Sequence, residues 1–105
     1  MSNDAPLSEQ FRIIAKRWVD ADSAANLLEE SKSAFLSRSM AELGDMAVYK
    51  AEMTVKASDG WDTYINRMVD ARKQASLLKV QLEYIRMQFS EWQSKEATRR
   101  AEMKL

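Results

Sequence analysis

Pairs of carboxylates are the side chains in this sequence whose type and spacing come nearest to catalytic or metal-binding chemistry. Glu29 precedes Glu30, and Glu91 is followed by Glu96. Acids carry out acid–base catalysis or bind a metal ion when they are buried and converge from several elements. Several acids here instead have a cation four residues away, the spacing of surface ion pairs on a helix. These pairs are Glu91–Lys95, Glu96–Arg100 and Lys79–Glu83. The carboxylates therefore predict a solvated helix surface.

The side chains that most enzymes use near neutral pH are missing. The 105 residues include no histidine and no cysteine. Their absence removes the usual general base, the commonest metal ligand and any thiolate nucleophile. No stretch has the pattern of a phosphate-binding loop, a nucleophile elbow or a metal motif. The sequence therefore predicts a protein that is not an enzyme and that uses no cofactor, metal ion or small-molecule substrate.

Four basic residues lie close to the C-terminus, beyond Trp92. They are Lys95, Arg99, Arg100 and Lys104. A basic helix end beside an aromatic ring can bind phosphate and stack a base, or it can complement the helix dipole and stay solvated. The whole chain balances 16 basic against 16 acidic residues, and Glu96 and Glu102 interrupt the cluster. We therefore favour the solvated helix end and expect any nucleic-acid binding to be weak.

The scarcity of turn-forming residues predicts an all-α fold with few, long helices. Two glycines and one proline occur in 105 residues, and strong helix formers dominate the rest. Gly44 marks one helix end, because glycine takes the left-handed conformation that closes a helix. Ser8 can cap the first helix, and Ser58 or Asp59 the last. We expect a flexible tail over 1–6 and one helical domain over 7–105, with helices at about 8–43, 47–57 and 61–104. The sequence does not decide whether the first helix bends near residues 20–23.

The last of these helices carries a heptad pattern. With Trp61 at position a, ten successive a and d positions bear no charge, which is typical of a coiled-coil-like seam. They are Trp61, Tyr64, Met68, Ala71, Ala75, Leu78, Leu82, Ile85, Phe89 and Trp92. The first helix offers an apolar face to this seam, made of Leu7, Phe11, Ile14 and Trp18.

Charges beside the seam indicate what it packs against. The e positions are mostly basic, Arg72 among them, so a homodimer through this seam would have no complementary charges. The first helix supplies acids for this basic row: Asp20, Asp22, Glu29 and Glu30. We therefore predict an antiparallel long-helix hairpin with a short intervening helix.

A second apolar row, here called the c/f stripe, lies on nearly the opposite side of the same helix. Its members are Leu77, Val80, Tyr84 and Met87. A surface helix normally keeps one apolar stripe, so two opposed stripes indicate that this stretch is covered from both sides. Because the chain has one other long helix, we interpret the c/f stripe as a homo-oligomer interface. The alternative is that residues 47–57 fold back and cover it.

Sequence features also bear on location. No apolar run approaches the roughly 18 residues of a membrane span. Residues 1–7 lack the charged-then-apolar pattern of a signal peptide. The absence of cysteine agrees with a reducing compartment. We therefore expect a cytoplasmic protein with no membrane partner.

Several stretches of the chain, all within residues 40–105, resemble small helical proteins of tailed phages and prophages. These stretches are GDM (44–46), AEMTVKAS (51–58), LKVQLEYIRM (78–87) and EWQSKEATRRAE (91–102). The resemblance implies a phage or prophage product, in the host cell's cytoplasm, of the kind often encoded near recombination and single-strand-DNA functions. It carries no motif of known chemistry, and no functional residue is transferred from it.

Three functions follow from these observations. The leading hypothesis is a non-enzymatic phage accessory protein that acts through helical protein–protein contacts, in the setting of DNA recombination or replication. The first alternative is a direct single-stranded nucleic-acid binder that uses the basic C-terminal helix. The second is an inhibitor of a host defence complex, because small proteins without catalytic residues can act by blocking a surface.

Overall fold

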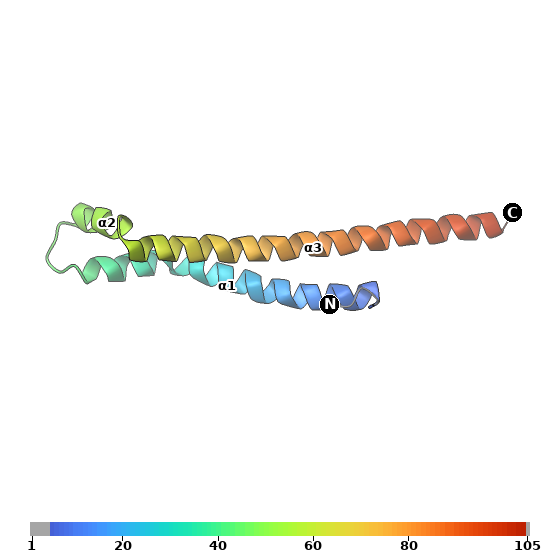
Figure 1. Cartoon of the computed structure of the whole chain (residues 1–105), viewed down its shortest axis with the longest axis horizontal. Helices are drawn as coiled ribbons and strands as arrows, with labels where there is room; N and C mark the ends of the chain where they lie inside the picture. Colours follow the sequence, from blue (N-terminus) through green and yellow to red (C-terminus); the bar gives the residue numbers. More distant parts are fainter. Residues whose placement is uncertain (1–4, 105) are drawn as a thin grey trace. The chain divides into compact units, whose positions relative to one another are not determined.

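The computed structural model describes residues 5–104 and contains three α-helices (Figure 1). The helices are α1 (Leu7–Ala41), α2 (Val48–Lys56) and α3 (Asp59–Met103). No strand occurs within residues 5–104, so the all-α prediction is confirmed. Each helix begins and ends within two residues of its expected position, and α1 is helical throughout 20–23. Of the predicted tail, residues 1–4 lie outside the described residues.

Glycine and serine set the helix boundaries around α2. Gly44 has φ 78°, the left-handed conformation, shortly after α1 ends. Ser58 caps α3, because its Oγ accepts a hydrogen bond from the Trp61 N–H at 3.2 Å. The same hydroxyl donates to the Val55 carbonyl at 2.6 Å and so ties the end of α2 to the start of α3.

The start of α1 differs from the prediction. Ser8 lies inside the helix and does not cap it. The Pro6 carbonyl instead accepts the N–H groups of Glu9 and Gln10, both at 3.0 Å. Proline can occupy this place because the first turn of a helix has no use for its missing N–H.

The chain forms two compact units, and α1 and α3 contribute to both. The turn unit is Asp20–Ala75, and the terminal unit combines Met1–Val19 with Ser76–Leu105. In the turn unit Phe35 stacks on Tyr64 at 4.5 Å between ring centroids, and the Tyr64 hydroxyl donates to the Leu28 carbonyl. α2 belongs to this unit, where its Ala51 and Val55 are buried.

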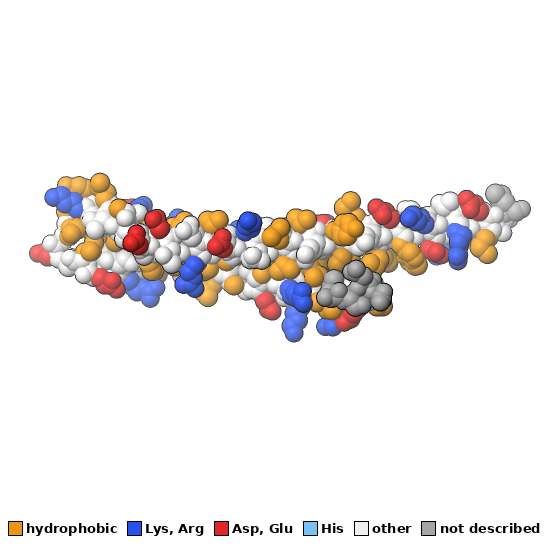
Figure 2. Space-filling view, viewed as in Figure 1, with side chains coloured by type: hydrophobic (Ala, Val, Ile, Leu, Met, Phe, Trp, Pro, Cys, Tyr) orange, Lys and Arg blue, Asp and Glu red, His pale blue; other side chains and the backbone are white. Residues whose placement is uncertain are grey.

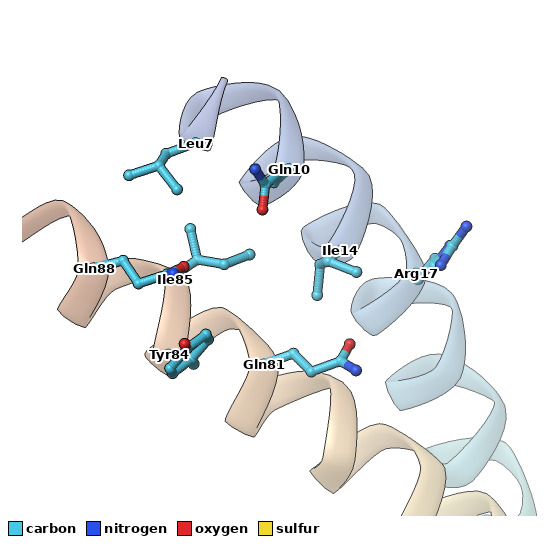
Figure 3. A pocket seen from close by; sticks show the side chains of 8 residues that line it. All are labelled: Leu7, Gln10, Ile14, Arg17, Gln81, Tyr84, Ile85 and Gln88. Atoms are coloured by element: carbon cyan, nitrogen blue, oxygen red, sulfur yellow. The ribbon is translucent and has the colours of Figure 1, made fainter. Parts of the chain in front are cut away.

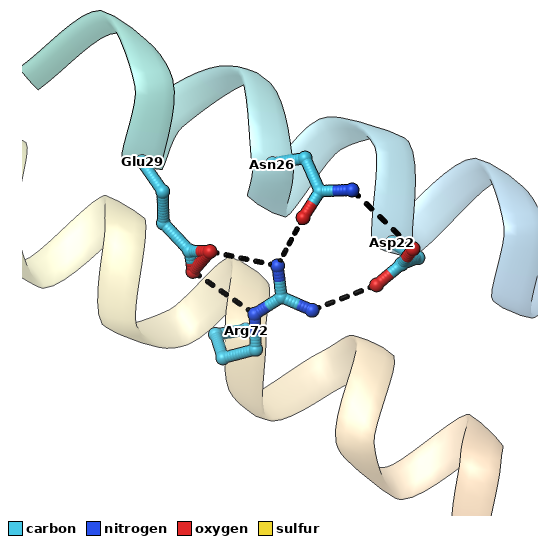
Figure 4. A network of polar contacts seen from close by, with 4 residues as sticks. All are labelled: Asp22, Asn26, Glu29 and Arg72. Carbon is cyan, nitrogen blue, oxygen red and sulfur yellow. Dashed lines mark hydrogen bonds and ion pairs between the residues drawn. The ribbon is translucent and has the colours of Figure 1, made fainter.

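A polar network fixes the register of α1 and α3 in the turn unit (Figure 4). The Arg72 guanidinium donates to both carboxylate oxygens of Glu29 at 2.8 and 2.9 Å, to Asp22 at 2.7 Å and to Asn26 Oδ1 at 2.6 Å. The predicted pairing of a basic e residue with acids of the first helix is confirmed here. Tyr64 stacks on Phe35, whereas Arg72, later in α3, bonds to Asp22, earlier in α1, so the two helices run antiparallel in this unit, as the predicted hairpin requires.

These hydrogen bonds shift the acid–base equilibria of the network. The hydrogen bond from Arg72 lowers the pKa of Glu29, against the opposing effect of desolvation. The pKa of Arg72 is raised, first by its hydrogen bond to Glu29 and then by that to Asp22. Both shifts favour the charged forms that hold the network together.

The core of the terminal unit is an apolar cluster between the two helices. Ile14, Leu82 and Ile85 are buried, and around them pack the half-buried Leu7, Phe11, Ala15, Trp18 and Leu78. Along α3 the first eight of the ten predicted seam positions, Trp61 to Ile85, are buried or half-buried. The last two, Phe89 and Trp92, are 46% and 53% exposed.

We expect Leu82→Asp to unfold the protein. An unpaired charge in this cluster costs several kcal/mol, on the order of the whole stability of a small domain, about 5–15 kcal/mol. The matched control is Leu27→Asp on an exposed position of α1, which should cost less than about 1 kcal/mol. Urea denaturation followed by circular dichroism measures both. Equal losses in the two variants would contradict the burial of Leu82.

The Arg72 network should make stability depend on pH in the acid range. Because the pKa of Glu29 is lowered in the folded state, the stabilisation it provides is present above the ordinary carboxyl pKa of about 4.3 and is lost as the pH falls below it. Glu29→Gln should therefore lower Tm at pH 7, and its difference from the wild type should shrink in acid. Glu30→Gln, next to it and outside the network, is the control. An equal Tm shift at both pH values would contradict this role.

Candidate interaction surfaces of α3

The c/f stripe is the largest set of apolar side chains that α3 leaves exposed in the terminal unit. Its four members, Leu77, Val80, Tyr84 and Met87, are 51–64% exposed. They lie in the same stretch of helix as the buried Leu82 and Ile85, whose side chains face α1. The contacts that α2 makes through Ala51 and Val55 belong to the turn unit. The stripe is therefore an apolar surface on the described chain, and a partner for it stays a prediction.

A groove of about 640 Å³ adjoins the stripe in the terminal unit (Figure 3). Tyr84 belongs to both, and Ile14 and Ile85 lie within the groove. Gln10, Gln81 and Gln88 line it with amide groups, and Arg17 lines it with a guanidinium. Amides donate and accept hydrogen bonds and a guanidinium donates them, so this groove suits the polar rim of a protein contact. No carboxylate of the described residues lines it.

A second groove, of about 860 Å³, lies where α1 begins. Pro6, Leu7 and Phe11 line it from the N-terminal side, and Phe89 and Trp92 line it from α3. The two α3 rings stack at 6.0 Å between centroids. A cation, the Arg86 guanidinium, lies 5.5 Å from the ring centroid of Phe11 at the edge of this groove. The heptad pattern placed Phe89 and Trp92 in the seam but gave no sign that they line an open groove.

The four C-terminal cations are interspersed with the acidic residues Glu96 and Glu102. Lys95, Arg99, Arg100 and Lys104 are all exposed. Arg99 lies 3.6 Å from Glu96. On the face shown in Figure 2, basic and acidic side chains alternate along this end of α3. Trp92 stacks on Phe89 and lines the second groove.

The ion pairs on α3 differ in spacing from the predicted ones. Glu96 pairs with Arg99 and Glu83 pairs with Arg86 at 3.5 Å, both three residues apart. The prediction paired these acids four residues away, with Arg100 and Lys79. Either spacing joins neighbours on a helix surface, and these exposed pairs are worth little to stability.

No family model, curated protein or solved structure matches the chain. The function must therefore be argued from the surfaces of α3. Within residues 5–104 no three acidic, histidine or cysteine side chains converge on a metal site. None of the described helices is long and apolar enough to span a bilayer.

We expect the C-terminal cations to bind single-stranded DNA weakly. Phosphate contacts make log affinity fall with log salt, by roughly 0.7 per phosphate on single strands. Because acids interleave these cations, binding should vanish by physiological salt. A fluorescence titration at low and physiological salt measures this, with Arg99→Ala/Arg100→Ala beside the wild type. Tight binding that persists at physiological salt and drops in the variant would instead identify a nucleic-acid interface.

Proposed function

We propose that this protein is a non-enzymatic accessory protein that acts through helical protein–protein contacts. The first of these contacts is self-association through the c/f stripe, Leu77, Val80, Tyr84 and Met87. The observation that carries the proposal is the exposure of these four large apolar side chains in one row along α3. Single exposed apolar residues are ordinary on protein surfaces, whereas contiguous apolar patches mark interaction sites.

The spacing of the stripe fits a second helix. Its members follow one another at steps of three, four and three residues, the interval that brings side chains into register with a facing helix. The groove beside Tyr84 supplies amide groups for the rim of such a contact. Two-fold symmetry would bring the stripes of two copies together, and the same patch would then serve on both sides of the interface.

The energy of the contact predicts reversible assembly. Complete burial of an aliphatic side chain contributes roughly 1.5–3 kcal/mol, so two half-exposed stripes together gain on the order of 10 kcal/mol. Loss of translational and rotational freedom costs about 4–15 kcal/mol. The two terms are of similar size, and the oligomer should therefore dissociate on dilution.

The cellular setting that we propose is that of a phage or prophage product in the host cytoplasm, and it rests on the resemblance carried by residues 40–105. In that setting the second partner is a protein of the recombination or replication machinery. A pull-down from host lysate distinguishes this partner from a host defence complex, the competing assignment.

We expect Val80→Glu/Tyr84→Glu to form a smaller assembly than the wild type while staying helical. Two buried carboxylates per copy would oppose the contact, because they lose their hydration without gaining a partner. Val48→Glu/Tyr49→Glu is the matched control, since it makes the same two substitutions at exposed positions of α2. Light scattering gives the mass and circular dichroism the helix content. The proposal fails if both double variants keep the mass of the wild type.

A further inference from the structure

The C-terminal part of α3 lacks a packed partner among the described residues. From Gln93 to Met103 each residue is exposed except Glu96, which is half-buried. α1 begins at Leu7, which lines the second groove together with Phe89 and Trp92. Tertiary packing normally supplies most of the stability of a helix in water. This segment therefore presents a helical surface that a partner can cover.

The heptad pattern of the intrachain seam continues through this segment. After Ile85 the a and d positions are Phe89, Trp92, Glu96, Arg99 and Met103. Apolar residues thus lie toward both ends of the row, and opposite charges lie between them. Because the row is continuous with the core of the terminal unit, whatever covers it extends an existing helix–helix interface.

We infer that the C-terminal ends of α3 from two copies pair antiparallel along this row. In an antiparallel coiled coil each a position faces a d position of the partner. When Glu96 faces the partner's Arg99, Met103 falls opposite the partner's Trp92. Two-fold symmetry repeats both contacts, so the pair forms two ion pairs between copies, beside the Glu96–Arg99 pair within each helix, and two methionine–tryptophan contacts. The thioether of methionine packs well against aromatic rings, and here it occupies the exposed edge of the second groove.

The flanking residues agree with the same register. Lys95 at position g comes next to the partner's Glu102, and Gln93 at position e comes next to the partner's Arg100. A parallel pair would instead set Glu96 against the partner's Glu96, and Arg99 against the partner's Arg99. Charged seam residues add little affinity but select orientation strongly. The charges therefore specify a second copy of this chain, in the antiparallel direction.

This contact is separate from the c/f stripe, because a and d positions lie on nearly the opposite side of α3. Neither contact needs the residues of the other. Two different two-fold contacts on one chain allow copies to join beyond a dimer. A chain with its stripe blocked should therefore still dimerise through its C-terminal ends.

The test measures dimerisation in the full-length Val80→Glu/Tyr84→Glu variant by sedimentation velocity. Adding Glu96→Arg or Arg99→Glu replaces two attractive pairs with two repulsive ones, so either change should weaken the dimer at least about tenfold. An equimolar mixture of these two variants should regain the dimer, because the mixed pair again sets cations against anions. Lys104→Glu, a charge reversal outside the row, is the control and should leave the dimer unchanged.

Three outcomes separate this inference from the proposed function. If the stripe-blocked variant is monomeric at every concentration, or if the mixture associates no better than its components, the C-terminal pairing is wrong and the stripe contact stands. If blocking the stripe leaves the wild-type mass unchanged but Glu96→Arg lowers it, the proposed stripe contact fails and the pairing stands. Circular dichroism checks the folding of each variant; Arg99 is exposed and Glu96 is half-buried outside the apolar core, so both substitutions should leave the fold intact.

Discussion

The structure depends on one constraint, which is that a single long helix, α3, must be covered by a shorter one. α3 has 45 residues and α1 has 35. α1 packs along one face of α3, through Ile14, Leu82 and Ile85 in the terminal unit and through the Arg72 network in the turn unit. The chain has no further long helix within the described residues, so its own folding leaves a second face and one end of α3 exposed.

Apolar packing and polar contacts have different roles in this hairpin: the first stabilises it and the second sets its register. The buried seam residues supply stability but little register, because one apolar side chain can replace another at small cost. Arg72 supplies register, since its planar guanidinium meets Asp22, Asn26 and Glu29 in one arrangement. The same division recurs in the pairing that we infer between copies, where apolar residues lie toward the ends of the row and Glu96 and Arg99 select the direction.

Much of this could be predicted from sequence, because helix patterns are local. The small number of glycines and prolines predicted three helices. The heptads that start at Trp61, and the acidic residues that the first helix offers to basic e positions such as Arg72, predicted an antiparallel hairpin. The cap of α1 could not be predicted reliably, since Pro6 and Ser8 both suit a helix start. The open groove at Phe89 and Trp92 was not predicted from the sequence. This groove depends on which α3 residues the start of α1 packs against, and the heptad pattern of α3 carries no information on that. The function of the c/f stripe was inferred from sequence, and its exposure is consistent with that interpretation.

We propose that α3 completes its packing with other copies of the chain. Sedimentation equilibrium of the unmodified protein over a dilution series measures this association. We expect a mass above the 12.1 kDa of one chain that falls toward this value on dilution. A mass of 12.1 kDa at every concentration would contradict it.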